Sequence, residues 1–130
     1  MIKNLIFDFG KVLVDYDFLD FFAKIIPDKE RCSAFGALLN TVHFANIIDR
    51  EERPFEETME DFIGHHKEFE KEIRVFMEHY PEIVKCEMPG MRDLLTKLKA
   101  EGFKLYGLTN WCSKVHLTMQ PFAIFRPLDG

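Results

Sequence analysis

The chain has few cysteines, and its histidines do not have the spacing of a metal site. Its 130 residues contain only three cysteines, Cys32, Cys86 and Cys112, an odd number without CxxC spacing. This pattern favours neither a disulfide framework nor a zinc site, and reduced cytosolic thiols are the simplest interpretation. The two adjacent histidines, His65 and His66, would point about 100° apart on a helix and could not chelate one metal ion together. The sequence therefore predicts no histidine-based metal site.

Positive charge and long hydrophobic runs are also scarce. Seventeen basic residues stand against 22 acidic ones, which gives a net charge of -5. That balance disfavours nucleic acid or an anionic membrane as a partner. The apolar runs are far too short to span a membrane, and the amino terminus does not resemble a signal peptide. We expect a soluble, cytoplasmic protein. Its length allows at most one ordinary domain, or one small domain with an insertion, and 47% hydrophobic residues suffice for a core.

The first fifteen residues carry the strongest local signal. Residues 2–7 are predicted to form a buried, central parallel strand that ends at Asp8, and Gly10 then allows a sharp turn. A carboxylate with apolar neighbours on both sides must be hydrogen-bonded, paired or bound to a cation. Taken alone, Asp8 could equally be a turn former.

A long helical pattern follows. Residues 18–26 are expected to form a helix with Asp17 as its N-cap and Pro27 at its end. Further helices are expected over 31–49, 55–65 and 67–80, and the charged stretch 49–54 is interpreted as a solvated turn between them. Residues 16–87 are therefore predicted to be an all-helical block.

Strand-like sequence returns late in the chain. A helix is predicted over 91–100, with Gly102 as a left-handed C-cap. A second strand over 103–108 then delivers Thr109 and Asn110 to its carboxyl end, which mirrors Asp8 on the first strand. A carboxylate nucleophile, a hydroxyl and backbone amides at a helix start, meeting where two parallel strands end, are what phosphoryl transfer needs.

Taken together, these motifs resemble the haloacid dehalogenase (HAD) superfamily. Residues 7–15 look like its first motif and Leu108-Thr109-Asn110 like its second. The resemblance implies an α/β fold with a partial HAD-like (Rossmannoid) parallel-sheet core, residues 1–15 and 88–130, and an inserted all-helical cap, residues 16–87. It implies a hydrolase that dephosphorylates a small phosphorylated metabolite, most like sugar-phosphate phosphatases.

The resemblance also implies roles for single residues. Asp8 would be the catalytic nucleophile that becomes an aspartyl-phosphate, and it would bind Mg²⁺ together with the carbonyl of Gly10. Thr109 and Asn110 would bind the substrate's phosphoryl group. Hard oxygen ligands suit this cofactor. Phosphatases of the family commonly carry a general acid where this chain has Gly10, and a glycine cannot move protons.

The later family motifs, a lysine and an acidic pair, have no counterpart here, and Lys104 and Lys114 are assigned solvated surface roles. Residues 125–130 resemble only the start of a third strand. We therefore expect a truncated form, an engineered fragment or a shortened gene product, stabilised by its cap or by self-association into a homo-oligomer. The alternative function is a catalytically silent fold that binds a partner. A metal-free dehalogenase is disfavoured, because a halide-displacing site does not call for the backbone ligand at Gly10. A purely helical interaction module is disfavoured, because it does not explain the strand motifs of residues 2–15 and 103–110.

Overall fold

The computed structural model describes residues 1–130 and combines helices with two small sheets. Strand β1 (Asn4–Phe7) pairs in parallel with β4 (Lys104–Gly107), in a register that sets Phe7 beside Gly107. Strand β2 (Val14–Tyr16) pairs antiparallel with β3 (Val84–Glu87). The chain is thus an α/β protein at the coarse level, and both polar motifs follow strands of the same parallel pair.

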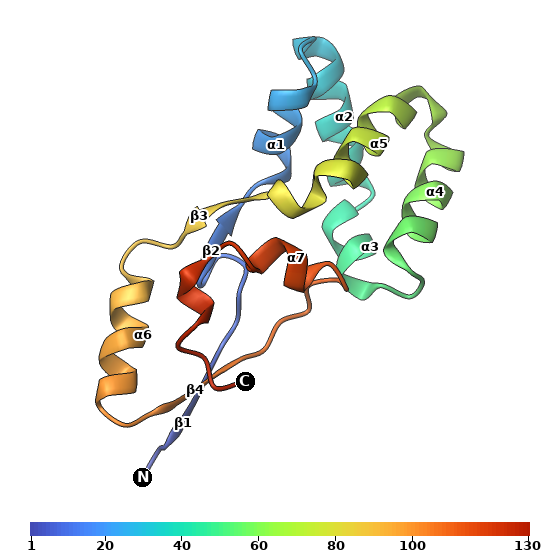
Figure 1. The fold of residues 1–130 in the computed structure, drawn as a ribbon. Coiled ribbons are helices and arrows are strands. Elements are labelled where there is room, and N and C mark those ends of the chain that lie inside the picture. The colour runs from blue at the N-terminus through green and yellow to red at the C-terminus, as the bar shows by residue number, and fades with distance from the viewer.

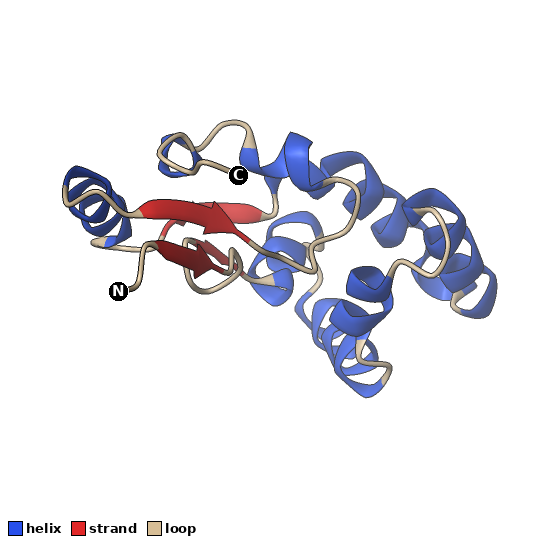
Figure 2. Cartoon of the chain, turned by 90° about the horizontal axis from the view of Figure 1, so that it is seen from below, coloured by secondary structure: helices blue, strands red, loops and turns tan.

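Figure 1 shows five helices, α1 to α5, gathered at one end of the molecule, away from β1, β4 and α6 (Met91–Ala100), and we use the word cap for this helical part. Their order is α1, α2, α3, α4 and α5, with bounds Phe18–Ile25, Lys29–Thr41, Phe44–Arg50, Phe55–His65 and Glu70–His79. A short 3₁₀ turn, η1 (Lys67–Phe69), lies between α4 and α5, and a second, η2 (Tyr80–Glu82), follows α5. In Figure 2 one helix and the strands lie toward the left, and most of the other helices extend to the right, so the molecule is elongated.

Several local predictions are confirmed. Helix α1 begins after Asp17, whose side chain accepts the Asp20 N–H at 2.9 Å, and α4 has its predicted bounds. Helix α6 spans Met91–Ala100, also as predicted, and Gly102 has the left-handed φ of +92° expected after it. These elements were predictable because caps and helical periodicity are local signals.

The prediction of an all-helical block over residues 16–87 is wrong at both ends. Tyr16 closes strand β2, and residues 84–87 form β3, so the helical part lies between Phe18 and Glu82. The two strands form a short ribbon at the junction of the cap with the rest of the chain (Figure 1). The chain enters the helical cap through β2 and leaves it through β3. Because these two strands are hydrogen-bonded to each other, the two ends of the cap are held side by side.

The prediction that the first strand is buried and central is also wrong. Strand β1 pairs only with β4, and the side chain of Ile6 is 66% exposed. Only the other face of the pair is covered, where Leu105 is fully buried. The carboxyl-terminal residues lie along the far edge of β4, because Asp129 N–H donates to the Leu105 carbonyl at 2.6 Å and Gly107 N–H donates to the Gly130 carbonyl at 2.7 Å.

The remaining elements close this covered face. After β4 the chain runs through residues 108–114 into the short helix α7 (Val115–Met119) and the turn η3 (Ala123–Phe125). Ile124 of η3 is fully buried, and the rings of Phe9 and Phe125 meet edge to face at 4.7 Å. No helix is long and apolar enough to cross a membrane.

Candidate active site

The four predicted site residues lie together. Because β1 and β4 run parallel in register, and Leu108 N–H donates to the Phe7 carbonyl at 2.9 Å, the segments that follow both strands leave the sheet at the same edge. A pocket of about 100 Å³ opens there, and its lining residues are Asp8, Gly10, Tyr16, Phe18, Asp49, Tyr80, Thr109, Asn110 and Trp111. We call it the strand-end pocket.

Asp8 differs from the expectation in one respect. Its side chain is exposed, so it does not carry the desolvation cost that its apolar neighbours suggested. Its Oδ1 accepts the Phe9 N–H at 2.7 Å, and the Phe9 carbonyl accepts N–H donors from Val12, Leu13 and Val14. This tight turn fixes the carboxylate at the mouth of the pocket while Oδ2 stays available to a ligand.

Position 10 has no room for a side chain, so only glycine fits there without a shift of its neighbours. A Cβ built there would lie 2.7 Å from Cε1 of Tyr16 and 3.4 Å from Cζ3 of Trp111. Those two rings pack edge to face with centroids 5.0 Å apart and form a wall of the pocket. The glycine therefore lets the backbone approach the two rings closely, and any side chain at this position would push the Tyr16 ring aside.

We expect Gly10→Ala to destabilise the protein by about 1–3 kcal/mol, because the added methyl overpacks the Tyr16–Trp111 wall. Urea denaturation measures the loss. Gly64→Ala is the matched control: nothing lies within 4 Å of its Cβ position in α4, so it should stabilise by about 0.5–1 kcal/mol. Equal effects at the two glycines would contradict the crowding at Gly10.

Thr109 and Asn110 follow β4, but they do not stand at a helix start, because α7 begins only at Val115. The prediction that these two residues stand at a helix start is therefore wrong. The Thr109 Oγ1 accepts the Trp111 N–H at 3.2 Å, which leaves its hydroxyl hydrogen free to donate. The Asn110 Nδ2 donates to Oδ2 of Asp49 at 3.5 Å, a long contact. The side-chain donors that this loop brings to the pocket are therefore one hydroxyl and one amide.

Sequence reasoning missed Asp49. Helix α3 continues through the start of the charged stretch, so Asp49 is helical and half-buried in the pocket rather than part of a solvated turn. Burial raises the pKa of its carboxyl, and the negative charge of Asp8 raises that pKa further. No local signal in the sequence marks this residue, because cap packing alone brings it opposite Asp8.

Two contacts hold the segment after Asp49 against the loop after β4. Glu51 accepts the Ser113 N–H through Oε2 at 2.7 Å, and Glu56 forms an ion pair with Lys114. The predicted solvated role of Lys114 is corrected by this pair and by its position over the Phe55 ring, 5.5 Å from the centroid. The cap is therefore tied to the loop that carries Thr109 and Asn110.

The pocket suits a cation. Its lining includes two carboxylates, Asp8 and Asp49, and no basic side chain, so a phosphate group could enter only with a cation that offsets the charge. No group of three or more metal-ligating side chains occurs in the chain. Mg²⁺ needs only one or two carboxylates when phosphate oxygens and water complete its shell, so Asp8 and the Gly10 carbonyl fit it in the presence of substrate.

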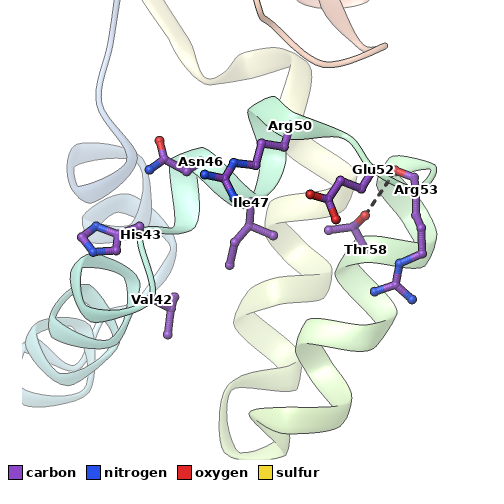
Figure 3. Close-up of a pocket in the computed structure, with 8 residues that line it drawn as sticks. All are labelled: Val42, His43, Asn46, Ile47, Arg50, Glu52, Arg53 and Thr58. Atoms are coloured by element: carbon purple, nitrogen blue, oxygen red, sulfur yellow. Dashed lines mark hydrogen bonds between the residues drawn. The ribbon is translucent and has the colours of Figure 1, made fainter.

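A separate cavity of about 310 Å³ lies in the cap. Figure 3 shows its lining, which comes from the turn between α2 and α3, from α3, from the loop after α3 and from α4: Val42, His43, Asn46, Ile47, Arg50, Glu52, Arg53 and Thr58. None of the predicted site residues contributes. Arg50 follows Asp49 in α3 but lines this cavity instead of the strand-end pocket, so the two neighbours serve different surfaces.

No protein-family model, curated protein or solved structure matches this chain. The function is therefore inferred from the residues and geometry of the strand-end pocket.

Proposed function

We propose that the chain is a HAD-like hydrolase that removes the phosphoryl group from a small phosphorylated metabolite through an aspartyl-phosphate on Asp8. The observation that carries the proposal is the convergence of Asp8, Gly10, Thr109 and Asn110 in one pocket at the ends of two parallel strands. Their combination of carboxylate, hydroxyl and amide matches phosphoryl transfer.

The residues have distinct tasks in this reaction. The exposed Asp8 carboxylate attacks phosphorus, held in place by the Phe9 N–H at Oδ1. The Thr109 hydroxyl and the Asn110 amide donate hydrogen bonds to the phosphoryl oxygens. A Mg²⁺ ion bound by Asp8 and the Gly10 carbonyl would neutralise charge on the phosphoryl group. The rings of Tyr16 and Trp111 form a wall of the pocket beside these groups.

The size of the pocket limits the substrate. About 100 Å³ is small beside the roughly 300–1,000 Å³ of pockets for drug-sized ligands. It suits the phosphoryl end of a small metabolite. Because the cap supplies Phe18, Asp49 and Tyr80 to the lining, the cap also shapes the space for the leaving group.

The test is hydrolysis of p-nitrophenyl phosphate and a panel of sugar phosphates by the purified chain, with Mg²⁺ and with excess EDTA. We expect turnover with Mg²⁺ and its loss in EDTA, restored when Mg²⁺ is added back, since the pocket contains no basic side chain to replace the cation. Equal turnover in EDTA would contradict the cation's role. No turnover from folded protein in any condition would contradict the function.

A second candidate is a catalytically silent fold that self-associates, and one observation favours it. The uncovered face of the β1–β4 pair exposes Ile6 by 66% and Leu108 by 69%, and Ile2 nearby is 72% exposed. Apolar side chains gathered in this way are typical of an interaction surface. Sedimentation velocity distinguishes the candidates when combined with the assay, because a self-associating protein without turnover satisfies only the second.

A further inference from the structure

Transfer of a phosphoryl group from an alcohol to Asp8 needs a proton for the departing oxygen, and this question rests on the proposed function. Without that proton the product would be an alkoxide, which is a poor leaving group near neutral pH. Four side chains of the strand-end pocket can ionise: Asp8, Tyr16, Asp49 and Tyr80. Asp8 is the nucleophile and must be ionised, so the donor is one of the other three.

The two tyrosines are poorly suited. Burial raises the pKa of Tyr16 above its ordinary value near 10, as does the negative charge of Asp49. Burial also raises the pKa of Tyr80, whose hydroxyl accepts a hydrogen bond from the Cys112 thiol at 3.4 Å. A general acid works best when its pKa lies near the working pH, and raised tyrosine pKa values move away from it.

Asp49 lies where a proton donor for the leaving oxygen is needed. It lines the same pocket as Asp8 and Thr109, although it comes from the cap. The Ser113 N–H to Glu51 bond and the Lys114–Glu56 ion pair, just after it in the chain, hold this part of the cap against the loop after β4. These contacts place Asp49 beside the loop that carries Thr109 and Asn110, where a proton donor is needed.

The surroundings of Asp49 favour its neutral form. The charged and ionisable groups around it are Asp8 after β1, Tyr16 of β2, Tyr80 of η2 and, in the loop after β4, Cys112. Half-burial is the larger cause, and it favours the protonated carboxyl by raising the Asp49 pKa without depending on the charge of Asp8. The Asn110 amide contacts Oδ2, so Oδ1 is the oxygen that would carry the proton.

We propose that Asp49 is the general acid and base of the reaction, supplied to the strand-end pocket by the cap. In the first step an Asp8 oxygen bonds to phosphorus, the bond from phosphorus to the leaving oxygen breaks, and that oxygen takes the Asp49 proton. In the second step the Asp49 carboxylate takes a proton from water as the water oxygen bonds to phosphorus. The bond between phosphorus and Asp8 then breaks, which releases phosphate and restores protonated Asp49.

The test compares two leaving groups in Asp49→Asn. p-Nitrophenolate departs without protonation, whereas glycerol from glycerol 2-phosphate needs a proton. We expect kcat/KM for glycerol 2-phosphate to fall by about 10²–10⁴-fold and that for p-nitrophenyl phosphate by less than about tenfold. Arg50→Gln is the matched control, because this neighbour in α3 lines the cap cavity and should leave both substrates unaffected.

Other results would overturn the proposal. Equal losses on both substrates in Asp49→Asn, or no loss on either, would remove the role of Asp49. A loss confined to glycerol 2-phosphate in Tyr16→Phe would assign the proton to Tyr16. A series of aryl and alkyl phosphates tests wild-type protein directly: kcat/KM should depend weakly on leaving-group pKa, and a steep dependence would exclude any proton donor. No turnover by wild type would overturn the proposed function and this role with it.

Discussion

Asp8→Asn is expected to lower kcat for p-nitrophenyl phosphate by at least about 10³-fold, because an amide oxygen cannot form the aspartyl-phosphate. The Asn side chain has almost the same shape, and its oxygen can still accept the Phe9 N–H that Oδ1 accepts at 2.7 Å. Asp8 is exposed, so the substitution leaves no buried cavity. The loss should therefore be chemical, with an unchanged urea midpoint.

The matched control is Asp93→Asn, an exposed aspartate in α6 that makes no hydrogen bond or ion pair through its side chain and lies outside the strand-end pocket. It should keep wild-type turnover. Incubation with substrate followed by acid quench and mass spectrometry adds a direct readout, because a phosphoryl group should be found on Asp8 in wild type only. Turnover in Asp8→Asn above about a tenth of wild type would show that another group is the nucleophile.

The parts of the fold that could be predicted are those with local causes. The bounds of α4 and α6 follow from apolar periodicity, and the start of α1 follows from Asp17, which caps its first turn. The polar ends of β1 and β4 were found for a related reason: each is an apolar run followed at once by residues that cannot belong to it.

Features that depend on contacts between distant parts of the chain could not be predicted from the sequence. Strand β2 has only three residues, too few to show a period, and its partner β3 lies on the far side of the cap sequence. Asp49 lies in a charged stretch that looks solvated, yet the docking of α3 half-buries it in the pocket. The exposure of Ile6 depends on what covers the sheet, which composition does not reveal. The site was therefore predictable on the strand side and not on the cap side.

The packing of the cap is centred on one aromatic ring. Phe76 of α5 is fully buried, and its ring centroid lies within 5.3–6.3 Å of six others. These neighbours come from α1, α3, α4 and η2: Phe18, Phe21, Phe22, Phe44, Phe55 and Tyr80. Two of them, Phe18 and Tyr80, also line the strand-end pocket. The same cluster thus stabilises the cap and shapes the site.

Phe76→Ala should lower the free energy of unfolding by about 3–5 kcal/mol, because it removes a buried ring and leaves a cavity that six neighbours must share. That is a large part of the roughly 5–15 kcal/mol typical of a domain, so partial unfolding at 37 °C is expected. Urea denaturation measures it as a lower midpoint with an unchanged slope.

The control for Phe76→Ala is Leu94→Ala in α6, where a side chain 41% exposed is removed from a helix surface and the effect should stay near 0.5 kcal/mol. At a temperature where Phe76→Ala remains folded, its KM should rise more than its kcat falls, because Phe18 and Tyr80 shape the pocket while Asp8 and Thr109 lie on the strand side. A loss below about 1 kcal/mol would mean that the surrounding rings close the space, and the cluster would then not be the rigid support of the pocket.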